Sequence, residues 1–82
     1  MKQPSAASDV YKRQIYREVF DSLTPREKEV VRLVALGKLN KVIAADLNIT
    51  EKTVQQHRSV ACHKLSVRNV AELVEFLKVL ES

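Results

Sequence analysis

Residues 50–65, TEKTVQQHRSVACHKL, carry polar side chains at spacings that could bring several hydrogen-bonding groups to one side of a helix. Gln55 and Gln56 supply carboxamides, and Ser59 supplies a hydroxyl. A carboxamide can donate to and accept from adenine in the major groove of DNA, and serine can serve donors or acceptors on either base type. The other interpretation is that the glutamines are solvated helix formers and that Ser59 bonds back to the carbonyl of residue 55.

Positive charge gathers around the same stretch. The whole chain has a net charge of +4. Residues 38–68 hold six Lys/Arg against two Asp/Glu, whereas residues 69–82 hold one Lys against three Glu. This distribution is typical of a surface that meets a polyanion, although a solvated basic face would look the same.

The residues that could bind a metal or act as a nucleophile are poorly placed for either role. Cys62 and His63 are adjacent, so on a helix their side chains point about 100° apart, and His57 lies five positions earlier. The sequence has no Gly-rich phosphate loop. We therefore expect no catalytic residues, no metal, no cofactor and no small-molecule ligand, and we interpret Cys62 as a half-buried apolar residue.

Composition favours a small helical domain. The chain has 82 residues, 45% of them hydrophobic and 5% aromatic, with one Gly and two Pro, which predicts an all-α fold with an aliphatic core. The lone Cys62 excludes an internal disulfide and fits a reducing compartment. No apolar run approaches the roughly 20 residues of a membrane span. We expect a cytoplasmic protein that does not contact membranes.

The N-terminal residues differ from the rest of the chain in their sequence pattern. Residues 1–14, MKQPSAASDVYKRQ, lack helical periodicity and predict a disordered leader. SAASDVYKRQ also resembles the in-frame translation of a transposase-based sequencing adapter. We expect this leader to be an adapter-derived artefact that stands in place of a longer N-terminal part. Residues 15–22 are expected to be a linker or a short helix, and residues 23–82 a helix-turn-helix domain.

Local signals in 23–82 predict four helices. Thr24, Pro25 and Glu27 form a capping-box start for a helix over 25–36 that ends at Gly37. Asn40 is expected to cap a short helix over 41–47, and Asn48 is a candidate for a left-handed turn before a helix over 51–65 capped by Thr50. Asn69 is expected to cap a last helix over 70–80. The order of a short helix, a tight turn and a longer helix with a polar outer face predicts a helix-turn-helix.

The expected buried positions follow the helical period. In the helix over 51–65 they are Val54, Ala61 and Leu65, which leaves the glutamines and Ser59 on the opposite side. In the last helix they are Val70, Leu73, Val74, Leu77 and Leu80, with Phe76 at the edge of the stripe.

Residues 23–74, LTPREKEVVRLVALGKLNKVIAADLNITEKTVQQHRSVACHKLSVRNVAELV, resemble the LuxR/FixJ-type DNA-binding domain, the C-terminal output module of bacterial response regulators and quorum sensors. Four motifs carry the resemblance: LTPRE, G..NK.IA..L.I, KTV..HR and KL.VRN.AEL. Each alone would be weak evidence for the family, but the four occur together in the expected order. The resemblance implies a compact four-helix domain whose third helix enters the major groove of double-stranded DNA. It also implies a homodimer on DNA through the fourth helix, with RNA polymerase as a further candidate partner.

Carried over position by position, the resemblance assigns three groups of residues. The base-reading positions are Gln55, Gln56 and Ser59. The phosphate-contacting positions are Lys41, Lys52, Thr53, His57 and Lys64. The dimer-contact positions are Glu72, Phe76 and Val79.

Two residues of this stretch, Arg58 and His57, have competing interpretations. Arg58 lies nearer the core side, and we expect an ion pair with Glu27 or Glu29 rather than a DNA contact. His57 could bond to phosphate or to backbone. Leu39 and Val42 depart from the family pattern by making their surface more apolar, and Ala61 departs from it by replacing a larger aliphatic side chain.

The resemblance therefore predicts sequence-specific binding of double-stranded DNA and regulation of bacterial transcription, as the output domain of a two-component or quorum-sensing-type regulator. One alternative is a promoter-binding domain like the fourth region of a sigma factor, which shares the LTPRE opening. Another is a helical protein-interaction module without DNA binding. TVQQHR followed by KLSVRN.AELV suits the regulator family better than the sigma-factor alternative, whereas only a test of DNA binding separates the interaction module.

Overall fold

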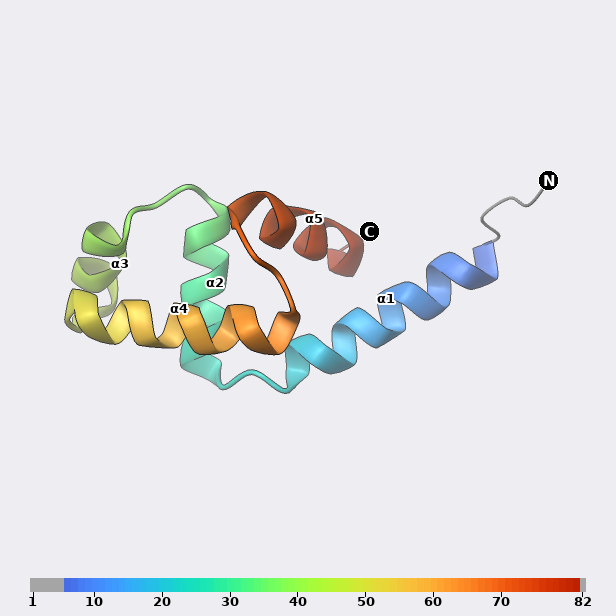
Figure 1. The fold of residues 1–82 in the computed structure, drawn as a ribbon, viewed down its shortest axis with the longest axis horizontal. Coiled ribbons are helices and arrows are strands. Elements are labelled where there is room, and N and C mark those ends of the chain that lie inside the picture. Colours follow the sequence, from blue (N-terminus) through green and yellow to red (C-terminus); the bar gives the residue numbers. More distant parts are fainter. Residues whose placement is uncertain (1–5, 82) are drawn as a thin grey trace.

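The computed structural model describes residues 6–81, and these residues form helices and connecting turns only. The helices are α1 (Ala6–Asp21), α2 (Pro25–Ala35), α3 (Asn40–Leu47), α4 (Glu51–Leu65) and α5 (Val70–Glu81). In Figure 1, α2 to α5 gather into one body while α1 runs outward from it toward the N-terminus. The all-α prediction is confirmed, and each of the four expected helices is present to within one residue at either end.

The start of α2 forms as its local sequence predicts. The Thr24 hydroxyl accepts a hydrogen bond from the Glu27 backbone N–H at 3.1 Å, and the Glu27 carboxylate accepts from the Thr24 N–H at 3.0 Å. Both donors would otherwise lack a partner at the helix end, so this capping box fixes where α2 begins. Gly37, with φ of +89°, turns the chain away after α2.

The turn between α3 and α4 is set by two residues. Asn48 adopts the left-handed conformation with φ of 58°, as the sequence predicts. Thr50 then caps α4, because its hydroxyl accepts the N–H of Thr53 at 3.1 Å. The turn therefore holds α4 at a fixed angle to α3, the arrangement of a helix-turn-helix.

The expectation that Asn40 caps α3 is wrong. The capping position is Leu39, whose side chain makes no capping hydrogen bond, and Asn40 is the first residue inside the helix. The Asn40 side chain bonds instead to two residues of α4. The Asn40 side chain, which local sequence predicts as a helix cap, therefore makes tertiary contacts instead.

The expected disorder of the leader does not hold for its described residues, while its origin as an adapter artefact stays a prediction. Residues 6–14 belong to α1 rather than to a disordered segment, and residues 15–21 are the second half of the same helix; residues 1–5 lie outside the described part of the chain. Tyr16, Val19 and Phe20 of this second half pack onto the core. This packing stabilises the helix. Residues 1–14 by themselves do not indicate it, because the side chains that pack lie further along the chain.

The core is aliphatic with two exceptions. Val30, Val31, Ile43, Val54 and Ala61 have no exposed surface, and the buried state of Val54, Ala61 and Leu65 confirms the predicted inner face of α4. Phe20 and Phe76 join this core, although the sequence predicted Phe76 at the edge of the stripe. Val70, predicted to face inward, is exposed instead.

Candidate nucleic-acid interface

The polar face of α4 is open to solvent. Gln55, Gln56 and Ser59 are all exposed, whereas Val54 and Ala61 on the other side of the helix are fully buried. The 3.6-residue period separates the two sides, so the side chains that could hydrogen-bond to bases point away from the core. The geometry fits the predicted base-reading role of the three residues, which stays a prediction.

A row of hydrogen bonds joins α3 to this face. The Arg58 guanidinium donates to Asn40 Oδ1 at 3.0 Å, and Asn40 Nδ2 donates to Gln55 Oε1 at 2.9 Å. Gln55 Nε2 in turn donates to the Ser59 hydroxyl at 2.9 Å. Two of the three predicted base-reading side chains are therefore held by neighbours. Sequence reasoning missed this row, because its members are 15 and 18 residues apart across two helices.

The expected ion pair of Arg58 with Glu27 or Glu29 is wrong. Arg58 bonds to Asn40, while Glu29 pairs with Arg26 and Glu27 pairs with Lys64. Arg58 lies close enough to α3 to donate to the side-chain amide of Asn40. This hydrogen bond replaces the ion pair that was expected with α2.

Four of the five predicted phosphate-contacting residues fall into two groups. Lys41 and Lys52 are exposed near the first turns of α3 and α4, where helix N-termini also favour anions. Thr53 and His57 are half-buried, and the Thr53 hydroxyl lies 2.9 Å from that of Thr50. Exposure therefore leaves the two lysines best placed to meet a phosphate backbone.

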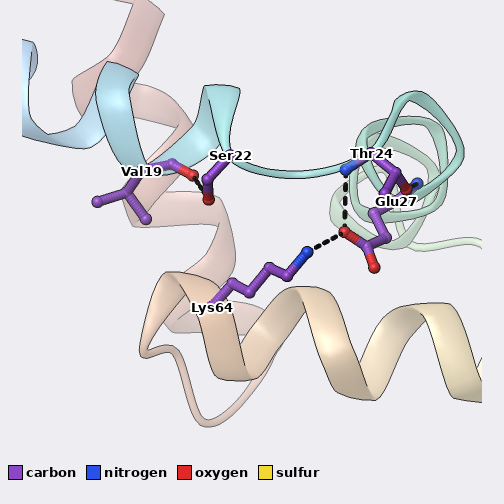
Figure 2. Close-up of polar contacts among 5 residues, drawn as sticks. All are labelled: Val19, Ser22, Thr24, Glu27 and Lys64. Atoms are coloured by element: carbon purple, nitrogen blue, oxygen red, sulfur yellow. Dashed lines mark hydrogen bonds and ion pairs between the residues drawn. The ribbon is translucent and has the colours of Figure 1, made fainter.

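Lys64, the fifth predicted phosphate contact, has a partner within the chain. Its Nζ lies 3.0 Å from Glu27 Oε1, the same oxygen that accepts the Thr24 N–H (Figure 2). Glu27 is the one charged residue among the described residues that is buried, with 6% of its surface exposed. In the free chain Lys64 thus neutralises a buried carboxylate, and its predicted phosphate contact stays a prediction.

Several groups act on the carboxyl of Glu27. Burial by itself raises its pKa, but hydrogen bonds from Thr24 and Lys64 and the nearby charges of Lys64 and His57 lower the pKa overall below its ordinary value. The carboxylate is therefore the stable form in the folded chain. The interpretation of Glu27 as a structural residue is supported by these contacts.

The predicted dimer-contact residues of α5 differ from one another in exposure and in their contacts. Glu72 is exposed and accepts the Arg68 backbone N–H at 2.7 Å, and its own N–H donates to Asn69 Oδ1 at 2.9 Å. Val79 is half-buried. Phe76 is covered: its ring stacks on that of Tyr16 in α1, with centroids 4.3 Å apart and planes 6° from parallel. Phe76 is therefore buried in this structure rather than at the edge of the apolar stripe, and its dimer contact stays a prediction.

Other kinds of site find little support in the part of the chain that the structure describes. Residues 6–81 contain no cluster of three or more His, Cys, Asp or Glu side chains arranged to hold a metal ion. Burial raises the pKa of the Cys62 thiol, an effect that the charge of Arg58 partly offsets, so the unreactive thiol is favoured. No helix among the described residues is long and apolar enough to cross a membrane.

Several known proteins with similar sequences are regulators from bacteria. Residues 21–77 match the family of bacterial regulatory proteins, luxR family. The chain is 38% identical over 64 residues to nodulation protein W of Bradyrhizobium diazoefficiens, covering 78% of this chain and 28% of that protein. It is 36% identical over 63 residues to the tetrathionate response regulatory protein TtrR of Salmonella typhimurium, covering 77% of this chain and 31% of that protein. The chain thus spans less than a third of the length of these relatives.

Solved structures agree with these sequence matches. Full-length FixJ from B. japonicum superposes with a TM-score of 0.85 at 28% identity, over 93% of this chain and 37% of that one. The response regulator StyR superposes with a TM-score of 0.76 at 42% identity, over 79% of this chain and 33% of that one. With its helix-turn-helix of α3 and α4, and with a family match over more than half its length, the chain belongs to the luxR family of bacterial regulatory proteins.

Proposed function

We propose that this chain binds double-stranded DNA in a sequence-specific manner by placing α4 in the major groove, and that it regulates bacterial transcription as the output domain of a response regulator. One observation carries the proposal: α4 presents two carboxamides and a hydroxyl to solvent, on a helix fixed by the Asn48 turn and the Thr50 cap. An exposed helix of this kind is how helix-turn-helix proteins reach base edges.

In this proposal Gln55, Gln56 and Ser59 read bases, and the exposed Lys41 and Lys52 contact phosphates on either side. Thr53 and His57 are secondary phosphate contacts. Because phosphate contacts release condensed counterions, binding is expected to weaken steeply as salt concentration rises. The role is one of binding rather than catalysis, in keeping with the regulatory family.

A single copy reading three or four base pairs gains only about 1–3 kcal/mol of discrimination from each good bidentate contact. We therefore infer that two copies bind half-sites roughly one helical turn apart. Contact through α5, with Glu72 and Val79, is the proposed pairing mode, and Phe76 takes part only if α1 moves off it. Phosphorylation or a ligand would act on a separate signal-receiving part, and RNA polymerase is a further proposed partner.

The proposal is tested by binding of the full chain to labelled duplexes of random sequence at low salt, followed by competition with defined duplexes. Replacing Gln55 and Gln56 together by alanine should preserve non-specific binding but remove about 1–3 kcal/mol of sequence preference per lost contact. Gln14→Ala is the matched control, because Gln14 is also an exposed glutamine but lies on α1.

The rival interpretations make different predictions in the same experiment. Leu36 and Leu39 are 74% and 71% exposed, so each leaves apolar surface open to a protein partner. No retardation of any duplex at any concentration would favour the interaction module. Preference only for promoter-like duplexes would favour the sigma-factor-like alternative. Unchanged preference in the double glutamine variant would remove base reading by α4.

A further inference from the structure

The carboxamide of Gln55 is held at both ends. Its Oε1 accepts from Asn40 Nδ2 at 2.9 Å, and its Nε2 donates to Ser59 Oγ at 2.9 Å. Gln56, the next residue and also exposed, makes no hydrogen bond of this kind with the side chains of the described residues. The two glutamines of the same face therefore differ in freedom.

The direction of every bond in this row follows from one residue. Arg58 is half-buried, and a guanidinium carries only donors. The Asn40 end that faces Arg58 must therefore be its oxygen, so the Asn40 end that faces Gln55 is its NH₂ group. Gln55 must then turn its oxygen toward Asn40 and its NH₂ toward Ser59.

These bonds leave Gln55 with a defined set of free groups. One N–H on Nε2 and one lone pair on Oε1 remain for a ligand. A donor and an acceptor side by side match N7 and the N6 amino group of adenine. Turning the amide around would exchange the donor and acceptor sides and misalign this pair, so the orientation of the amide decides which base edge fits.

We propose that Asn40 is a positioning residue that fixes the orientation of the Gln55 carboxamide, and thereby the base pair that Gln55 prefers, with Arg58 fixing the orientation of Asn40. This inference rests on the proposed function, since it concerns how α4 discriminates between duplexes. Asn40 itself need not touch DNA. Its contribution is to hold a flexible side chain in one conformation before binding, which lowers the ordering cost that each complex must meet.

The experiment selects binding sites from a library of duplexes with a randomised central segment, using the full chain at low salt. Gln55→Ala identifies the base pair that Gln55 reads, as the position whose preference is lost. In Asn40→Ala we expect the preference at that same position to fall roughly 3- to 10-fold, because Gln55 becomes free to rotate. Preferences at the other positions should stay as in the unaltered chain.

Asn40→Asp is the sharper variant, because it keeps the shape of the side chain. The carboxylate still accepts from Arg58, but it can only accept from Gln55, so the Gln55 amide should turn round. The preferred base at the Gln55 position should then change in identity, not only in strength. The added charge weakens binding to all duplexes alike and cancels in a ratio of affinities. Asn69→Asp, the same change at the cap of α5, is the matched control and should leave every preference unchanged.

The outcomes separate this inference from the proposed function. If the unaltered chain selects no motif, the proposed function fails and the role of Asn40 falls with it. If the unaltered chain selects a motif and Gln55→Ala relaxes one position, but both Asn40 variants keep the original preference there, only the role of Asn40 is overturned. A motif that Gln55→Ala leaves unchanged also overturns it. Thermal melts of each variant establish that the compared chains are folded.

Discussion

Lys64 Nζ lies 3.0 Å from Glu27 Oε1, and this ion pair joins the last turn of α4 to the first turn of α2. The same carboxylate oxygen accepts the Thr24 N–H, so one oxygen serves both the helix cap and the contact between helices. The end of α4 opposite the Asn48 turn is thereby fixed to the body of the domain. The polar face of α4 is held at both ends before any ligand arrives.

Replacing Glu27 by alanine should destabilise the fold by about 1–2 kcal/mol, because it removes the acceptor for the Thr24 N–H and leaves Lys64 unpaired. Urea unfolding at neutral pH measures the change. Glu29→Ala on the same helix is the control, since Glu29 makes only an exposed pair with Arg26 and should cost less than about 1 kcal/mol. Equal costs for the two variants would contradict the role assigned to Glu27.

The lowered pKa of Glu27 predicts loss of stability in acid. A carboxyl whose folded pKa lies below its unfolded value stabilises the fold above the unfolded pKa, about 4.3 for glutamate, and loses that contribution as pH falls through the folded pKa. Urea midpoints measured from neutral pH down into this window should decline. Glu27→Gln should flatten the decline, because its amide cannot be protonated there, and an equally steep decline in this variant would assign the acid sensitivity to other groups.

Lys52 and Lys64 should behave differently in DNA binding. Lys52→Ala should weaken binding to all duplexes alike and reduce the slope of log affinity against log salt by about 1, because one phosphate contact is lost. Lys64→Ala should mainly lower the free energy of unfolding, because its Nζ is engaged by Glu27. Anisotropy titrations over a series of salt concentrations, paired with urea melts, measure both effects. A lower salt slope with unchanged stability in Lys64→Ala would instead support its predicted phosphate contact.

Tyr16→Ala should loosen α1 from α5. The half-buried Tyr16 ring stacks on Phe76, and removing it should cost roughly 1–3 kcal/mol of stability. Phe76 would then be uncovered on α5, so self-association measured by sedimentation equilibrium should increase. The double variant Tyr16→Ala with Phe76→Ala should not associate more than the unaltered chain. A monomer in both cases would mean that Phe76 does not support pairing.

Gly37→Ala tests the exit of α2. A Cβ added at Gly37 would meet no atom within 4 Å, so any cost comes from the backbone φ of +89° and not from crowding. That cost should be roughly 1–2 kcal/mol, measured as a shift in the urea midpoint. Asn48→Gly is the control at the other left-handed turn and should be tolerated or slightly stabilising, because glycine adopts this conformation freely. A neutral Gly37→Ala would mean that the turn relaxes to a negative φ.

Local sequence by itself determined the four helices of residues 23–82, the Thr24–Glu27 capping box, the left-handed Asn48 and the exposure of Gln55, Gln56 and Ser59. Each of these depends on neighbours within about four residues, because caps, turns and the helical period are local hydrogen-bonding and steric effects. The residue types and their order were therefore sufficient to place the polar face of α4.

Tertiary structure alone decided which polar side chains meet across helices. Asn40 hydrogen-bonds to Gln55 and Arg58 instead of capping α3. Lys64 forms an ion pair with Glu27, and the Tyr16 ring stacks on Phe76. These partners lie 15 to 60 residues apart in the chain, and Asn40 had a plausible local role that competed with the distant one. Packing of the apolar faces sets the distance and angle between the helices, and only that geometry selects one partner for a polar group among several of suitable chemistry.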